Sequence, residues 1–171
     1  MALTIRPATI VDLDDMVRIR HDAGVAAWLH IVPGEVFEAI PFPERWAAAV
    51  TGKDPRAGVL VAELEGRVVG FAITRPSGDD DAAPDTGELD GFFTEPSTWG
   101  AGVGRALLAA ATVALRDAGF RDATLWTAAL NHRPRRIYET AGWRLDGADR
   151  RRSFGGVEFT EVRYRIVTFG R

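Results

Sequence analysis

Three glycines at alternate positions, Gly100, Gly102 and Gly104, precede a run of apolar residues at helical spacing. A helix that begins here leaves its first backbone N–H groups unpaired, beside the positive end of the helix dipole. Because glycine has no Cβ, the phosphates of a ligand can approach such a turn closely. The spacing therefore indicates a diphosphate site made by the backbone between Gly100 and Arg105.

The alternating glycines alone leave other interpretations open. A tight strand-to-helix turn also favours glycine. A dinucleotide-binding fold places its glycines after an early strand, with an acidic residue roughly 20 residues later, whereas four strands are expected before this turn. A phosphate loop requires Gly-Lys-Ser/Thr, which does not follow. Neither rival fits the position of the turn.

A second segment whose residues could take part in chemistry is Asn131-His-Arg-Pro-Arg-Arg-Ile-Tyr-Glu-Thr-Ala-Gly-Trp143. Taken singly, Asn131 after a strand is a common turn residue, and Tyr138 on a short helix is typical of core packing. With the glycine turn, however, the segment resembles the GCN5-related N-acetyltransferase (GNAT) superfamily, whose second signature runs Asn, Tyr seven residues on, then Gly-Phe. The glycine segment Trp99 to Gly104 resembles the coenzyme motif of that superfamily, with Trp99 at the usual Arg or Gln.

The resemblance covers nearly the whole chain and implies an α/β fold with a central, mostly antiparallel sheet flanked by helices. It implies acetyl-CoA as cosubstrate, no metal, and transfer of the acetyl group to a primary amine by direct attack. A non-catalytic acetyl-CoA-binding sensor or partner module is the alternative. The residues that the resemblance assigns to coenzyme binding are Phe92, Phe93, Thr94, Gly100, Ala101, Gly102, Val103, Gly104, Arg105 and Asn131.

Acetyl transfer needs a neutral amine, although a lysine-like amine has a pKa of about 10.4. It also releases a thiolate whose conjugate acid has a pKa near 8.5. The resemblance implies that Tyr138 donates a proton to this thiolate. It also implies Glu88, six residues before Thr94, as the base; a solvated carboxylate at Glu88, with a water relay instead, is the alternative.

The elements that would position these residues follow from apolar periodicity and turn residues. Helices are expected between residues 9 and 50, at Gly102–Ala118 and at Pro134–Ala141. The segment Arg75 to Thr86 contains Pro, Gly and three consecutive Asp residues, which predicts a solvated loop. The expected strands are Leu3–Arg6, Gly58–Leu64, Val68–Thr74, Glu88–Thr94, Thr124–Ala128, Trp143–Arg151 and Val157–Val167.

The region from Trp28 to Trp46 lies where the superfamily builds its acceptor pocket. It is rich in aromatic residues, and Trp28 and Phe37 are our candidates for binding the acceptor. Ordinary core aromatics are the alternative interpretation. The acceptor itself, a small molecule or a peptide with an amine, is not specified by the sequence.

Composition limits the remaining possibilities. The chain has 171 residues, 46% of them apolar, which fits a single domain over 1–171. A net charge of -3 argues against nucleic acid as a partner, and the absence of a long apolar run argues against a membrane span and favours the cytoplasm. There is no cysteine, and the three histidines have no metal-ligand spacing. A homodimer that pairs through an exposed edge at Val157–Val167 is also expected.

Overall fold

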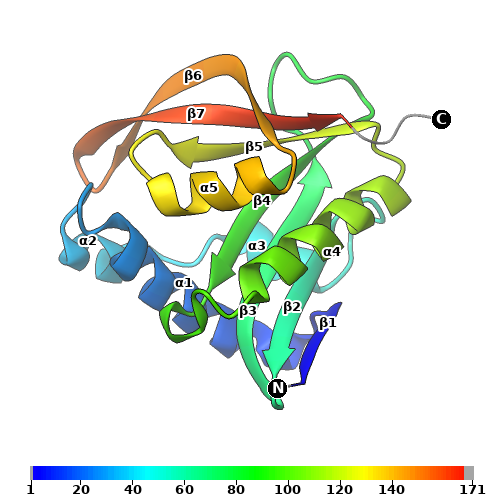
Figure 1. Cartoon of the computed structure of the whole chain (residues 1–171), viewed down its shortest axis with the longest axis horizontal. Helices are drawn as coiled ribbons and strands as arrows, with labels where there is room; N and C mark the ends of the chain where they lie inside the picture. The colour runs from blue at the N-terminus through cyan, green and yellow to red at the C-terminus, as the bar shows by residue number, and fades with distance from the viewer. Residues whose placement is uncertain (1, 168–171) are drawn as a thin grey trace.

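A seven-stranded sheet runs through the molecule in the order β1-β2-β3-β4-β5-β7-β6 (Figure 1). The computed structural model describes residues 2–167, so the first residue and the last four of the predicted domain lie outside it. All neighbouring strands are antiparallel except β4 and β5, which confirms the predicted mixed fold. The strands are β1 Leu3–Pro7, β2 Gly58–Leu64, β3 Arg67–Pro76, β4 Thr86–Thr94, β5 Asp122–Ala128, β6 Arg144–Phe154 and β7 Val157–Val167.

Helices cover both faces of the sheet. One face carries α1 Leu13–Trp28, α2 Gly34–Ala39 and α3 Glu44–Val50, and the other carries α4 Val103–Asp117 and α5 His132–Thr140. Short 3-10 turns, Ile10–Asp12 and Pro96–Thr98, precede α1 and the glycine turn. Prolines immediately before α2 and α3 fix where these two helices begin. None of the helices in residues 2–167 is long and apolar enough to span a membrane.

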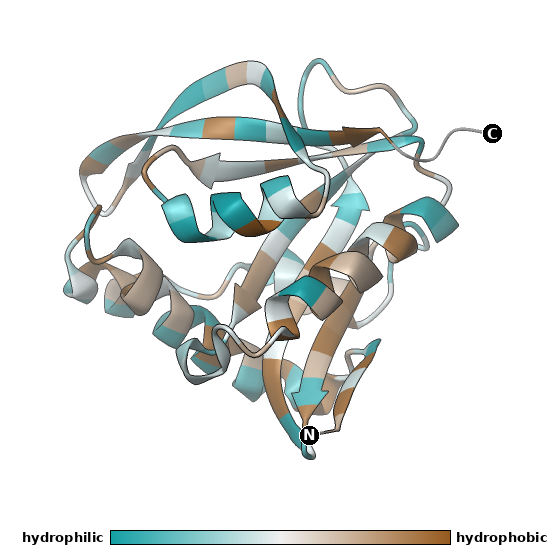
Figure 2. Ribbon diagram, viewed as in Figure 1, coloured by the Kyte–Doolittle hydropathy of each residue, from teal (hydrophilic) through white to brown (hydrophobic). Residues whose placement is uncertain are grey.

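Helix α4 packs on the sheet through one apolar stripe, visible in the hydropathy colouring of Figure 2. The buried residues of this stripe recur at helical spacing: Val103, Leu107, Leu108, Ala111 and Leu115. Burial of each leucine contributes about 1.5–3 kcal/mol to folding. This packing fixes the N-terminus of α4, and with it the glycine turn, against β3 and β4.

Strands β4 and β5 separate soon after they meet. Their parallel pairing is limited to Thr86–Asp122, Gly87–Ala123 and Glu88–Thr124. Beyond Glu88, β4 carries a β-bulge: Leu89 and Gly91 pair with consecutive residues of β3, which leaves Asp90 as an extra residue. A bulge bends its strand, and Figure 1 shows β4 running away from β5 after this point. We call this opening between the two strands the seam.

One expectation about the C-terminal strands was wrong, and one about the loop before β4 was incomplete. Val157–Val167 is not an edge, because β7 lies between β5 and β6 and is paired on both sides. The segment from Arg75 to Thr86 is not simply solvated: Asp79 docks on the sheet, where it accepts a hydrogen bond from Trp126 Nε1 at 2.9 Å and one from Arg163 at 3.1 Å. A half-buried indole on β5 and a buried guanidinium on β7 hold this acidic loop in place.

Candidate active site

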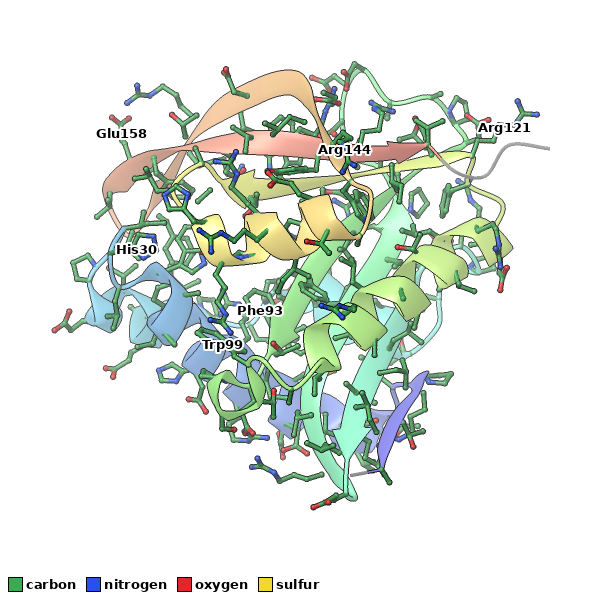
Figure 3. All side chains as sticks on the ribbon, viewed as in Figure 1. His30, Phe93, Trp99, Arg121, Arg144 and Glu158 are labelled. Carbon is green, nitrogen blue, oxygen red and sulfur yellow. The ribbon has the colours of Figure 1, made fainter. Side chains whose placement is uncertain are left out.

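A cleft of about 1020 Å³ opens at the seam and passes between the two halves of the sheet. Most of the predicted site residues line it: Trp28, Phe92, Phe93, Thr94, Gly100, Ala101, Gly102, Gly104, Arg105, Asn131 and Tyr138. Three do not: Val103 is buried under α4, Phe37 is buried behind Trp28, and Glu88 lies outside the lining. Figure 3 shows Phe93 and Trp99 below α5, where the cleft opens, with His30 to the left.

The cleft has two chemically different ends. One end, which we call the α4 end, is bordered by the turn from Gly100 to Arg105 and by Arg133 and Arg136. The other end, which we call the indole end, is bordered by Trp28, Trp46 and Trp126. Tyr138 and Phe92 also line the cleft.

The glycine turn presents free backbone amides at the α4 end. Gly100 and Gly102 have φ values of +87° and +86°, which other residues rarely adopt. The first intrahelical hydrogen bond of α4 runs from Ala106 N–H to Gly102 C=O, at 3.1 Å. The amides of residues 103–105 precede this bond and therefore lack a partner within the helix. The turn is thus able to bind an anion through its main chain.

Trp99, which stands where the family motif usually has Arg or Gln, has a structural role. Its indole N–H donates a hydrogen bond to the carbonyl oxygen of Thr94 at 3.0 Å, which ties the turn back to β4. The guanidinium of Arg133, on α5, lies 4.4 Å from the centroid of the Trp99 ring. Through this contact a positive charge from α5 is placed at the α4 end. The sequence prediction had omitted Arg133 and Arg136, although both line the cleft.

Glu95 anchors the start of the turn, and no residue pattern marked it. Its buried carboxylate accepts hydrogen bonds from Arg18 at 2.5 Å, from Ser97 at 2.9 Å and from Arg67. Burial opposes ionisation, but the hydrogen bonds from Ser97 and Arg18 outweigh it, so the pKa of Glu95 is below its ordinary value. The carboxylate therefore connects α1, β3 and the glycine turn while it is charged.

Tyr138 is buried on α5 with its ring near Phe92 and Tyr164, at centroid distances of 5.9 Å in both cases. Its hydroxyl has no hydrogen-bond partner within residues 2–167, although the residue lines the cleft. Burial raises the pKa of this phenol, with a smaller contribution from Tyr164. The hydroxyl is therefore protonated at neutral pH, and it is a weaker acid than an ordinary tyrosine.

Glu88 and Asp90 are close in sequence, but only Asp90 lines the cleft. Glu88 is ion-paired with Arg75 at 2.8 Å and accepts a hydrogen bond from the Gly78 amide at 3.3 Å. Burial raises the pKa of Glu88, against the opposing effect of Arg75. Neither of these two partners lines the cleft, although Arg75 also contacts Asp90, which does.

Asp90 reaches the cleft because it is the extra residue of the β-bulge. Its Oδ2 accepts hydrogen bonds from Trp46 Nε1 and Arg45 Nε, each at 2.8 Å, and lies 3.1 Å from Arg75. Burial alone would raise the pKa of Asp90, but the hydrogen bond from Arg45 and the charge of Arg75 hold it below its ordinary value. Asp90 is thus a charged residue that fixes the orientation of Trp46.

An aromatic cluster supports the indole end. The Trp28 ring contacts Phe159, Phe154 and Phe37, with centroids 5.1, 6.0 and 6.2 Å away. These contacts join α1 and α2 to the turn of the β6–β7 hairpin. His30, just beyond α1, donates a hydrogen bond from Nε2 to the Leu130 carbonyl at 2.9 Å, linking this side to the loop before α5. Phe37 therefore shapes the cleft from behind, by packing on Trp28.

Trp126 and Glu161 line the indole end and were not predicted. Trp126 lies on β5 and stacks with the Arg150 guanidinium, 4.0 Å from the ring centroid. Glu161 lies on the neighbouring strand β7 and is ion-paired with Arg150 at 2.6 Å. Within the described part of the chain, no group of three or more His, Cys, Asp or Glu side chains is arranged to hold a metal ion.

The sheet opens where its two parallel strands, β4 and β5, separate, and the free amides of α4 lie at this opening. Acetyltransferases of known structure share this fold. A ribosomal-protein-alanine N-acetyltransferase from Brucella melitensis has a TM-score of 0.78 at 24% identity, over 96% of this chain and 99% of that one. The PaiA N-acetyltransferase from Thermoplasma acidophilum, solved with coenzyme A, has a TM-score of 0.76 at 17% identity, over 95% of this chain and 98% of that one.

The sequence comparison assigns the family. The model of the acetyltransferase (GNAT) family matches residues 16–143, and the chain belongs to that family. A mycothiol acetyltransferase of Propionibacterium freudenreichii subsp. shermanii is 34% identical over 149 residues. That match covers 81% of this chain but 42% of the relative, so the chain spans less than half of the relative's length.

Proposed function

We propose that the chain is an acetyl-CoA-dependent N-acetyltransferase that acetylates a primary amine of a small molecule or peptide. The observation that carries this proposal is the seam: it joins the free amides at the α4 end, the unpartnered Tyr138 hydroxyl and the indole end in one cleft. Membership of the GNAT family supports the same reaction. The relatives named above use different acceptors by name, so they do not choose one for this chain.

The residues at the α4 end fit a coenzyme with a diphosphate. The amides of residues 103–105 and the dipole of α4 would hold its phosphates, with positive charge from Arg105 and Arg133 nearby. Beyond Glu88, β4 has no partner strand on its β5 side, so the backbone at 92–94 is available to the amide-rich pantetheine arm. The buried Asn131 lines the cleft and would contact the same arm.

Acetyl-CoA supplies the acetyl group as a thioester. The amine nitrogen forms a bond to the acetyl carbon while the bond from this carbon to sulfur breaks. Backbone amides of β4 would stabilise the charge that develops on the acetyl oxygen. Tyr138 gives its proton to the departing sulfur, and the proton lost by the amine returns the phenol to its neutral form.

The proton that leaves the charged amine before attack needs a separate route. Because Glu88 does not line the cleft, we propose that water carries this proton out, and that Glu88 influences the reaction only through Arg75 and Asp90. The alternative of a non-catalytic binding module requires that the cleft lack a proton donor, and the free Tyr138 hydroxyl argues against it. A homodimer remains a prediction, although not one that pairs through β7, and light scattering on the purified protein would check it. The cytoplasmic location also remains a prediction.

Calorimetric titration of the purified protein with acetyl-CoA tests the first half of the proposal. Incubation with a panel of primary amines, followed by detection of the free thiol, tests the second half. We expect saturable binding and amine-dependent thiol release. Folded protein that binds no acetyl-CoA would overturn the proposal, whereas binding without thiol release for any amine would favour the binding module.

A further inference from the structure

We propose that Glu161 binds the ammonium group of the acceptor, and that the acceptor is a primary amine on an aromatic or apolar body without a carboxylate next to the amine. This inference rests on the proposed function and adds to it the residue and the substrate class.

Two carboxylates line the cleft within residues 2–167, those of Asp90 and Glu161. Asp90 has little capacity left for a ligand. Its Oδ2 accepts hydrogen bonds from Trp46 and Arg45, and its Oδ1 accepts a second one from Arg45 at 3.2 Å. This carboxylate is committed to holding Trp46 and the strand bulge.

Glu161 has one oxygen engaged and one available. Its Oε2 accepts a hydrogen bond from Arg150 Nε at 2.6 Å and lies 3.7 Å from Arg152 Nε. No residue between 2 and 167 makes a hydrogen bond to Oε1. The side chain is only 14% exposed, and the residue borders the cleft. An acceptor with three N–H donors would satisfy this oxygen through a charge-assisted hydrogen bond.

The charge of Arg150 is divided between two carboxylates. Besides Glu161, Arg150 approaches Asp79 of the acidic loop, at 4.0 Å. Asp79 also interacts with Arg163, which Asp81 and Asp146 contact as well. Within the described residues, the connected network contains four arginines and five carboxylates, so its net charge is negative. The arginines are Arg150, Arg152, Arg163 and Arg165, and the carboxylates are Asp79, Asp81, Asp122, Asp146 and Glu161.

The rings at the indole end specify the rest of the acceptor. Trp28, Trp46 and Trp126 border the same cleft as Glu161. Indole faces attract ammonium groups and pack against apolar bodies. An α-carboxylate on the acceptor would instead add a negative charge next to Glu161, whose ion-pair network already has a net negative charge. The indole end is thus suited to amines such as 2-phenylethylamine rather than to amino acids such as phenylalanine.

The test compares Glu161→Gln with Glu158→Gln on the same strand. Glu158 is exposed and paired with Arg151, so it is a matched control outside the cleft. With 2-phenylethylamine as the acceptor, we expect E161Q to raise KM about tenfold or more, since a charge-assisted hydrogen bond contributes roughly 1.5–3 kcal/mol. The Kd for acetyl-CoA should be unchanged, and E158Q should match the wild type in both constants.

The same assay with phenylalanine measures the specificity directly. Wild-type protein should prefer 2-phenylethylamine by at least tenfold in kcat/KM, and E161Q should lose most of this preference. The inference is overturned if the wild type acetylates other amines but prefers the α-carboxylate, or if E161Q behaves as E158Q does. Both results leave the acetyltransferase proposal standing, which fails only if no amine in the panel releases thiol.

Discussion

The α4 end of the cleft offers consecutive backbone amides from one turn, whereas the indole end is assembled from side chains of α1, α3, β5 and β7. The first depends on a local backbone conformation, which Gly100 and Gly102 permit. The second depends on strand order and on packing between segments far apart in the sequence. Changes at the α4 end should therefore affect coenzyme binding alone, and changes at the indole end should affect acceptor binding alone. Glu161→Gln examines the indole end, and Gly102→Val below examines the α4 end.

The largest effect is expected for Tyr138→Phe, at the middle of the cleft. Loss of the proton donor should lower kcat by about 100-fold or more, as is typical of general acids. Acetyl-CoA and acceptor affinities should change little, because the ring and its contacts remain. Tyr164→Phe is the matched control: the Tyr164 hydroxyl donates to Glu139 at 2.6 Å, so its loss should reduce stability rather than kcat. Equal kcat values for the two variants would remove Tyr138 from the mechanism.

Gly102→Val should weaken acetyl-CoA binding by about tenfold, because a β-branched residue at φ +86° is disfavoured by roughly 1–2 kcal/mol. Calorimetry measures this affinity. Gly104→Ala serves as the comparison, since a Cβ there would lie 3.7 Å from Ile137 and Phe92, an ordinary contact distance. We expect near wild-type affinity for G104A unless the coenzyme itself occupies that space. If G102V binds normally, the turn is structural only.

Glu95→Gln should lower the free energy of unfolding by about 1–3 kcal/mol, because Arg18 loses its buried charged partner. The pKa of Glu95 is lowered in the folded protein. Its stabilising effect is therefore present above the pKa of an unfolded glutamate and is lost as the pH falls through the folded value. Urea unfolding at neutral and acidic pH should show the difference between wild type and E95Q shrinking in acid. A difference that is constant with pH would exclude this charge effect.

The smallest effect is expected for Glu88→Gln. Because Glu88 lies outside the cleft lining, kcat should stay within about twofold to threefold of the wild type, well below the effect of a lost general base. The raised pKa of Glu88 means that its contribution to stability is greatest below the unfolded pKa and declines as the pH rises through the folded value. A fall in kcat comparable to that of Y138F would restore Glu88 as the base.

The division between the two ends also explains what the sequence could reveal. The glycine turn and the segment from Asn131 to Tyr138 are each continuous, so residue type, spacing and the family resemblance could point to them as a candidate site. The bulge at Asp90 changes which side chains of β4 face the cleft, and no residue pattern marked it. Counting along a regular strand therefore pointed to Glu88 and passed over Asp90.

Glu161 and Trp126 illustrate a second limit. They come together because β7 inserts between β5 and β6, an order that a C-terminal hairpin in the sequence does not specify. The expectation of an exposed edge at β7 failed for the same reason. The docking of Asp79 on β5 and β7 was equally invisible, because composition reports the polarity of a loop and not the donors that it meets.

The pairing of β4 with β5 at only three positions affects how cooperatively the sheet unfolds. Beyond Glu88 the backbone hydrogen bonds that unite a sheet are missing, so the halves β1–β4 and β5–β7 are held together mainly by side chains under α4. If the pantetheine arm of the coenzyme pairs with β4 along the seam, it would supply some of the missing backbone hydrogen bonds. We expect the two halves to open separately without such an arm and together with it. Occupancy of the seam would then set the slowest amide exchange in the molecule.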